Sequence, residues 1–219
     1  VEKPVPVEKL PGFFDGCVSV QDGGAQLAAV LLNPGPEAKV LDACAAPGGK
    51  TCHLLERYSS CDQVLDLTAI DIDESRIEKI RSNLDRLKLE AKVFCGDAAN
   101  PDGVWSETQY DAILLDVPCS ATGVMRRHPD IRILRKKQDI AGLVSQQRSI
   151  LEQIWPLLKP GGQMLYATCS LLSAENEKQI EWFLQRDDGL ELPLEPNVEY
   201  VQKSHGIQTI PGVNNMDGF

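Results

Sequence analysis

Long apolar runs are missing from the 219-residue sequence, and aromatic residues make up only 5% of it. No run approaches the ~20 apolar residues that a membrane-spanning helix needs, and no basic-then-apolar leader opens the chain. A hydrophobic content of 42% and a charged content of 25% are typical of a globular protein. The length suffices for one α/β domain with a sizeable core. We therefore expect a soluble cytoplasmic domain.

A disulfide framework and a zinc-binding pattern are also missing. The seven cysteines form an odd set, and none stands at a zinc-ligand spacing. In a chain of cytosolic composition, scattered cysteines are more often core residues or catalytic thiols than disulfide partners. We predict no metal site. Candidate catalytic thiols must then be sought among Cys17, Cys44, Cys52, Cys61, Cys95, Cys119 and Cys169.

An excess of positive charge is missing as well, because the net charge is −10. This excludes indiscriminate binding to nucleic acid, which requires many basic residues. The segment 126–137, however, holds six of the 22 lysines and arginines and one acid. It carries +5 in a chain whose total is −10, which leaves −15 for the remainder. The segment is either a solvated helix face or a patch that directs an RNA to one place.

The pattern along the chain predicts an N-terminal extension before one catalytic domain. Residues 1–12 are rich in proline and charge and indicate an extended arm, and residues 13–36 indicate a short cap. The cap ends in the turn-forming run Asn-Pro-Gly-Pro at 33–36. We assign residues 1–36 to the extension and 37–219 to the catalytic domain. Because the chain begins with Val1 instead of Met, we expect a fragment or a processed form.

Apolar strands alternate with amphipathic helices from residue 39 onward. Strands are predicted at 39–43, 63–71, 91–95, 111–116 and 163–168. Asp73 is a candidate cap of the helix after the second strand. The helix before the fifth strand has an apolar inner stripe from Ile140 to Leu158 and is expected to stop at Pro160-Gly-Gly. Ser173 is expected to cap a last helix that runs to about Arg186. This alternation predicts a doubly wound, Rossmann-like α/β fold with a mostly parallel sheet. Ligands of such sheets bind beyond the carboxyl ends of the strands.

A glycine-rich turn follows the first predicted strand, in the run D-A-C-A-A-P-G-G-K-T at 42–51. Its glycines permit a close approach to a ligand, and the next helix presents its positive end. The spacing matches neither a P-loop nor G-x-G-x-x-G, so a purely structural turn remains an alternative. Asp71, Asp97 and Asp116 end or follow the next three strands. Each alone suits a helix cap, whereas the three together suit a nucleoside that carries a cationic group.

The three core motifs, L-D-A-C-A-A-P-G-G-K-T, D-V-P-C-S-A-T-G-V and Y-A-T-C-S, closely resemble those of the Fmu/Sun family of RNA cytosine-C5 methyltransferases. The resemblance includes the runs that start at Leu10, Val20, Arg126 and Asp217, and it covers nearly the whole chain. Gly23-Gly24 departs from the family's usual Ala-Ser. The resemblance implies methyl transfer from S-adenosylmethionine to carbon 5 of an RNA cytosine, with 16S ribosomal RNA as the expected substrate.

The same resemblance implies roles for the residues of the crevice. Asp71 would hold the ribose hydroxyls, Asp97 the adenine end, and Asp116 would face the methionine and the target base. Lys50 belongs to the cofactor loop, and Arg76 is a weaker candidate nearby. The loop that would wrap the methionine and ribose of the cofactor consists of Cys44, Ala45, Ala46, Pro47, Gly48, Gly49 and Lys50.

Cytosine carbon 5 is a poor nucleophile, so the implied reaction needs a thiolate at carbon 6, a donor near ring nitrogen 3 and a base. Cys119 and Cys169 follow the fourth and fifth predicted strands. If these strands are neighbours, ~5 Å apart, both thiols overhang one crevice. The resemblance nominates Cys169 as nucleophile and Cys119 as the residue that assists proton removal and product release. The proline-cysteine motif of DNA cytosine methyltransferases would instead nominate Cys119.

Asp116 is the candidate partner of ring nitrogen 3, protonated through burial. His128 suits a phosphate contact or a fold element, and the other five cysteines receive no catalytic role. Two alternatives stay open. The substrate is another RNA, such as transfer RNA, or the chain is an RNA-binding module on an inactive methyltransferase fold. The presence of Asp116, Cys119 and Cys169 together argues against an inactive copy.

Overall fold

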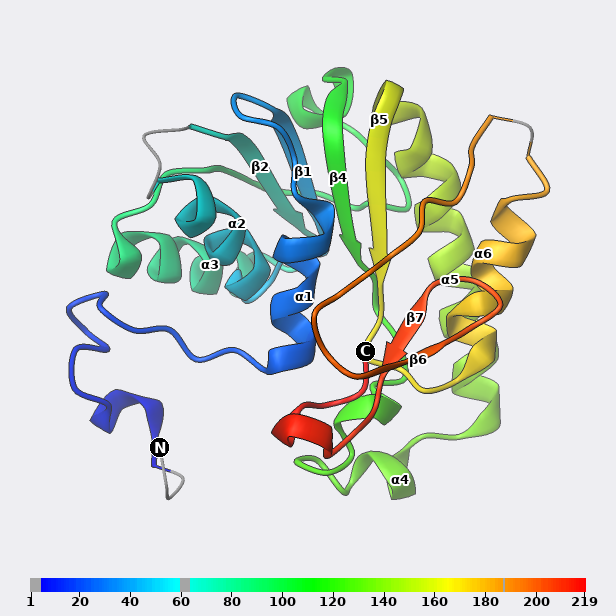
Figure 1. Ribbon diagram of the computed structural model, residues 1–219. Helices are drawn as coiled ribbons and strands as arrows, with labels where there is room; N and C mark the ends of the chain where they lie inside the picture. Colours follow the sequence, from blue (N-terminus) through cyan, green and yellow to red (C-terminus); the bar gives the residue numbers. More distant parts are fainter. Residues whose placement is uncertain (1–4, 60–63, 187) are drawn as a thin grey trace.

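Runs of consecutive apolar residues form the strands of one parallel sheet (Figure 1). A computed structural model describes residues 5–59, 64–186 and 188–219. The strand order is β3-β2-β1-β4-β5, with every neighbouring pair parallel, which confirms the predicted fold class. The strands are β1 (Lys39–Ala43), β2 (Asp66–Asp71), β3 (Lys92–Cys95), β4 (Tyr110–Asp116) and β5 (Leu158–Ala167).

Helices cover both faces of the sheet. Successive side chains of a strand point to opposite faces, so an apolar strand presents apolar side chains to the helices on each face. Val40 and Leu114 belong to one buried cluster, which contains residues of α1 (Gly23–Leu32), α2 (Gly49–Ser59) and α3 (Glu74–Leu87). Leu41 and Ile113 belong to the other, with residues of α5 (Lys137–Ile154) and α6 (Glu177–Phe183). All four strand residues are fully buried, so the core consists of two layers around the sheet.

The strand order reverses at β1, which pairs with β2 on one side and β4 on the other. In open parallel sheets this point forms a crevice beyond the carboxyl ends of the strands. The loop from Cys44 to Lys50 follows β1, Asp71 ends β2, and Asp116 ends β4. Parallel pairing therefore places these predicted site residues at one edge of the sheet.

The N-terminal extension is more ordered than predicted. A 3₁₀ helix spans Val7–Lys9, and the predicted cap contains α1, whose start is capped by Asp22. The Arg86 side chain of α3 donates hydrogen bonds of 2.9 Å to the carbonyls of Phe13 and Val18. The start of the cap is thus held against α3. Within the predicted arm, the 3₁₀ helix at Val7–Lys9 replaces extended backbone at these three residues. Residues 1–4 of that arm, and Cys61, lie outside the described residues.

The boundary between α5 and β5 also differs from the prediction. The helix ends at Ile154, a 3₁₀ helix covers Trp155–Leu157, and Leu158 begins β5 instead of closing the helical stripe. Pro156 explains the early end, because proline lacks an N–H and clashes with the preceding helical turn. The run at 160–162 lies inside β5, where the register with β4 shifts between Tyr110 and Ala112. It forms an irregularity in a strand and does not terminate a helix.

Ser173 does not cap the last helix. It begins a 3₁₀ helix, Ser173–Glu175, which non-helical Asn176 separates from α6. The helix α6 ends at Phe183, three residues before the predicted end. Beyond it, β6 (Tyr200–Gln202) and β7 (Ile207–Thr209) form an antiparallel hairpin. In the part of the chain that the structure describes, no helix combines the length and apolar character needed to cross a membrane.

Candidate functional site

The loop after β1 is tied to β2 and α3 by hydrogen bonds. The backbone N–H of Ala46 donates to Asp71 Oδ2 at 3.1 Å, and Arg76 donates to the Ala46 carbonyl at 2.9 Å. Gly48 has φ +94°, and a Cβ there would lie 3.2 Å from the Ile80 backbone. Only glycine adopts this conformation without strain, so the sequence of the loop determines its close approach to α3.

Asp71 lies beneath the loop and is 2% exposed. Besides the Ala46 N–H, it accepts a hydrogen bond from the Asp73 N–H at 3.2 Å, and an Arg76 guanidinium nitrogen lies 3.4 Å from Oδ1. A carboxylate has about four lone-pair sites, so these contacts leave capacity for further donors. The structure therefore makes Asp71 an anchor of the loop, and its contact with a ribose stays a prediction.

Asp97 follows β3 and is half-buried. Its Oδ1 accepts a hydrogen bond of 2.8 Å from the Ala99 N–H, which stabilises the turn after the strand. The N–H of Gly96 donates to the Asp71 carbonyl at 3.0 Å and ties this turn to the end of β2. The structure brings Asp97 to the same edge of the sheet as Asp71, and its contact with an adenine stays a prediction.

Lys50 and Asp116 form an ion pair across the crevice, with 2.6 Å between Nζ and Oδ2. Lys50 lies in the first turn of α2, and Asp116 ends β4. The side chain of Asp116 is 29% exposed, so the burial on which its predicted protonation depends is only partial. The Phe219 ring lies under the ammonium group, 5.0 Å from Nζ to the ring centre. A cation over an aromatic face is attracted to it, so Phe219 helps to hold Lys50.

Cys119 and Cys169 meet, with 3.4 Å between the two sulfur atoms. The register pairs Asp116 with Ala167, so the two loops leave neighbouring strands side by side. The hydrogen bond from Cys119, aided by Lys50, lowers the pKa of the Cys169 thiol against the opposing effects of burial and Asp116. The hydrogen bond to Cys169, burial and nearby negative charge raise the pKa of Cys119. Of the two thiols, Cys169 therefore loses its proton more readily than Cys119.

Asp42 is a residue of this crevice that the sequence-based reasoning missed. It is fully buried in β1, and burial raises its pKa to about 7 although the Thr51 hydroxyl donates to Oδ2 at 2.6 Å. Among the described residues, its Oδ1 has no hydrogen-bond partner. The available signal was a carboxylate inside an otherwise apolar strand, because such a group is costly to bury without a partner.

Glu175 is the second missed residue, and it is fully buried beside the two cysteine loops. Its carboxylate accepts hydrogen bonds from the residues that follow Cys119 and Cys169. No local sequence signal marks it, because it stands in the polar run 173–178 that resembles an exposed helix start.

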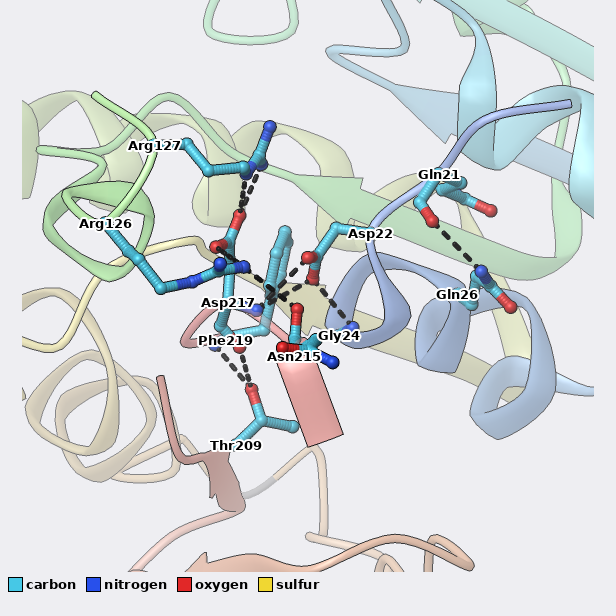
Figure 2. A network of polar contacts seen from close by, with 10 residues as sticks. All are labelled: Gln21, Asp22, Gly24, Gln26, Arg126, Arg127, Thr209, Asn215, Asp217 and Phe219. Carbon is cyan, nitrogen blue, oxygen red and sulfur yellow. Dashed lines mark hydrogen bonds and ion pairs between the residues drawn. The ribbon is translucent and has the colours of Figure 1, made fainter. Parts of the chain in front are cut away.

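The basic segment 126–137 divides into two parts. Arg126 and Arg127 pair with the buried carboxylate of Asp217, as Figure 2 shows. Arg135 donates to the Ser120 carbonyl at 3.1 Å, so half of the predicted RNA-facing cations have structural contacts. The remainder includes His128 and the cations Arg132, Lys136 and Lys137, which are exposed, and the paired side chains of Arg126 and Arg127 are themselves 44% and 49% exposed.

Three distant runs of the sequence meet at Asp217. Its backbone N–H donates to both oxygens of Asp22 at 3.1 Å, and its side chain holds Arg126 and Arg127 (Figure 2). The next N–H, of Gly218, donates to the carbonyl of residue 123 in the Cys119 loop at 3.1 Å. The runs that start at Val20, Arg126 and Asp217 therefore form one cluster beside the crevice.

Comparison with known proteins gives one matching family model, described as 16S rRNA methyltransferase RsmB/F, over residues 29–219. Ribosomal RNA small subunit methyltransferase B of Shewanella oneidensis is 53% identical over 217 residues, which are 99% of this chain and 49% of that protein. The protein of the same name from Vibrio cholerae is 50% identical over 100% of this chain and 48% of its own length. The chain thus spans about half the length of these curated relatives.

Two solved structures are similar over most of the chain. The crystal structure of PH0851 matches with a TM-score of 0.91 and 30% identity, over 99% of this chain and 48% of that one. The crystal structure of NSun6 from Pyrococcus horikoshii with SFG matches with a TM-score of 0.74 and 26% identity, over 86% of this chain and 49% of that one.

The asymmetry of the thiol pair predicts unequal alkylation. Because the thiolate is the reactive form, iodoacetamide should modify Cys169 faster than Cys119 at neutral pH. As the pH is raised, the alkylation rate at Cys169 should increase before the pH reaches the ordinary thiol pKa of about 8.5. The alkylation rate at Cys119 should increase only at higher pH. Initial rates from peptide mass spectrometry measure both sites. Equal rates at the two cysteines would contradict the assignment.

Proposed function

We propose, from the premise that the chain belongs to the RsmB/F family of 16S rRNA methyltransferases, that it methylates carbon 5 of a cytosine in 16S rRNA through a covalent adduct at carbon 6. The observation that carries the proposal is the pair of sulfur atoms 3.4 Å apart beside the Lys50–Asp116 ion pair. A nucleophile, a thiol next to it and a proton-transfer pair stand in one crevice. A ribosomal RNA substrate is consistent with the expected cytoplasmic location.

The crevice suits S-adenosylmethionine, which supplies an electrophilic methyl group on a sulfonium. The charges of Asp71, Asp116 and Asp42 all act on the thiol of Cys44, so three carboxylates surround the start of the loop. A ligand that carries a sulfonium and an ammonium group is attracted to such a site. Asp42 Oδ1, unpartnered within the described residues, points to a donor that the chain does not supply.

The thiolate of Cys169 adds to carbon 6, and its electron pair forms the carbon–sulfur bond. The ring nitrogen 3 takes a proton that passes from Lys50 through Asp116, which leaves Lys50 neutral. Carbon 5, now enamine-like, would take the methyl group from the sulfonium, and the electron pair of the broken sulfur–methyl bond would stay on the donor's sulfur as a thioether. A base then removes the proton from carbon 5, the carbon–hydrogen electron pair forms the ring double bond, and Cys169 leaves as a thiolate. Nitrogen 3 returns its proton through Asp116 to Lys50, which restores the ion pair. The Cys119 thiol donates to that thiolate as it forms and so favours its release.

The two cysteines should fail differently when replaced. Cys169→Ala cannot form the bond to carbon 6, so no covalent complex with RNA should appear. Cys119→Ala should attack and transfer methyl and then stall, because the departing thiolate lacks its donor. A denaturing gel with S-adenosylmethionine and a 16S rRNA fragment should show a ribonuclease-sensitive slow band for Cys119→Ala only. A single-stranded loop should trap better than a duplex, because the base must leave its stack.

Wild-type protein on the same RNA, with the modified base identified by mass, is the control for turnover. An adduct with Cys169→Ala and none with Cys119→Ala would falsify the assignment and make Cys119 the nucleophile. Methyl incorporation into transfer RNA and not into 16S rRNA would overturn the proposed substrate.

Replacement of Asp71 tests the cofactor site. If Asp71 holds both ribose hydroxyls, Asp71→Ala should weaken the binding of S-adenosylmethionine by about 3 kcal/mol or more, because hydrogen bonds to charged groups contribute ~1.5–3 kcal/mol each. Calorimetry measures the change. Asp73→Ala is the control, since Asp73 caps α3 on the exposed side and should leave the affinity unchanged. Unchanged affinity in Asp71→Ala would remove Asp71 from the site.

The exposed part of the basic segment is proposed to contact RNA. Lys136→Ala with Lys137→Ala should lower the affinity for RNA and flatten its salt dependence by ~1.4 in log–log slope, or ~0.7 per lost phosphate contact on a single strand. The control pair is Lys79→Ala with Lys178→Ala, on the exposed faces of α3 and α6. Equal slopes for both pairs would make the segment a solvated face. Filter binding across a salt series measures the slopes.

A further inference from the structure

Glu175 is a fully buried carboxylate that stands outside the reaction steps above. It ends the 3₁₀ helix Ser173–Glu175, between β5 and α6. A buried charge is costly unless hydrogen bonds compensate for the lost water. The hydrogen-bond partners of Glu175 therefore show which part of the structure the buried carboxylate stabilises.

Among the described residues, the hydrogen-bond donors to the Glu175 carboxylate all belong to, or hold, the two cysteine loops. Ser120, directly after Cys119, donates its backbone N–H to Oε1 at 2.8 Å and its hydroxyl to Oε2. Ser170, directly after Cys169, donates its hydroxyl to Oε2. One carboxylate thus joins the residues that follow the two thiols, although 50 positions separate them in sequence.

Gln147 of α5 completes the arrangement from the other side. Its Nε2 donates to Glu175 Oε1 at 3.1 Å and to the Pro118 carbonyl at 2.9 Å. The Cys119 loop is therefore held at the residue before the thiol and at the residue after it. Gln147 and the hydroxyl-bearing Ser120 and Ser170 are all fully buried, so water does not compete for these bonds.

We propose that Glu175 is a positioning residue that fixes the Cys119 and Cys169 loops against each other and keeps the shared proton of the thiol pair on Cys119. The carboxylate reaches both loops, and the contact between the two sulfurs at 3.4 Å depends on their spacing. The inference deepens the proposed function, because Cys169 as the attacking thiolate is part of that function.

The charge of Glu175 acts on the pair unequally. The hydrogen bond to Cys169, burial and the charge of Cys169 raise the pKa of Cys119 most, and the charge of Glu175 adds to them. Asp116 and Lys50 act on Cys169 with opposed signs, and Arg127 lies within electrostatic range of Cys169. Tyr166 of β5 also stands near Cys119 and Glu175, and burial raises its pKa, so it stays neutral.

The test compares Glu175→Gln with wild type in the alkylation of both cysteines by iodoacetamide, from about pH 6 to pH 9. Glutamine keeps the size of the side chain and removes its charge. The initial-rate ratio of Cys169 to Cys119 should fall about tenfold for each unit by which the two pKa values approach each other. Glu181→Gln is the matched control, because Glu181 is exposed on α6 and should leave the ratio unchanged.

An unchanged ratio in a Glu175→Gln variant that keeps the wild-type circular dichroism and Tm would overturn the proposal. If that variant does not fold, the double variant Ser120→Ala with Ser170→Ala removes the two hydroxyl donors and retains the charge. Its ratio should also fall because the loops lose their shared anchor, and an unchanged ratio there would again overturn the proposal. The readout needs no RNA. If the wild type does not methylate RNA and Glu175→Gln still lowers the ratio, the result counts against the proposed function alone.

Discussion

Parallel pairing of β4 with β5 is the constraint on which the site depends. The register sets Asp116 beside Ala167, and each strand continues within three residues into a loop that carries a cysteine. A shift of one residue would turn every side chain of β5 to the opposite face and would separate the two sulfur atoms. The buried side chains of β4, including Ile113, Leu114 and Leu115, fix that register by packing on both faces. The hydrophobic core thereby determines the distance between the thiols.

Charge balance in the crevice follows from the same arrangement. The carboxyl ends of β1, β2 and β4 carry Asp42, Asp71 and Asp116 at one edge of the sheet. Like charges this close would repel in a poorly solvated site, and the chain supplies Arg76 beside Asp71 and Lys50 beside Asp116. Asp42 forms no ion pair with the described residues, and burial raises its pKa to about 7. The crevice thus retains an excess of acceptors, which suits a cationic ligand.

The parts of the fold that depend on local pattern could be predicted from the sequence. The bounds of β1 and the capping of α3 by Asp73 follow from apolar runs and cap chemistry, and both are confirmed. The end of α5 could not be placed by periodicity, because Leu158 continues the helical stripe while Pro156 breaks the helix. The helix α1 was missed because its glycine-rich start, Gly23-Gly24, has low intrinsic helix propensity. Tertiary contacts explain those glycines, since a Cβ at Gly23 or Gly24 would meet Met216 or Phe219 within 3 Å.

The position of a side chain at the end of a strand could be predicted from the sequence. The pairing of charged side chains from distant parts of the sequence could not. A basic run such as 126–137 has the same sequence whether its arginines face solvent or a buried acid. Asp217 decides between these, because a fully buried carboxylate requires cations, and Arg126 and Arg127 supply them. The same tail brings Phe219 under Lys50, whose ammonium group pairs with Asp116. The C-terminal cluster therefore acts on the crevice through Lys50, because Arg126 and Arg127 stabilise the tail that positions this lysine while their side chains stay 44% and 49% exposed.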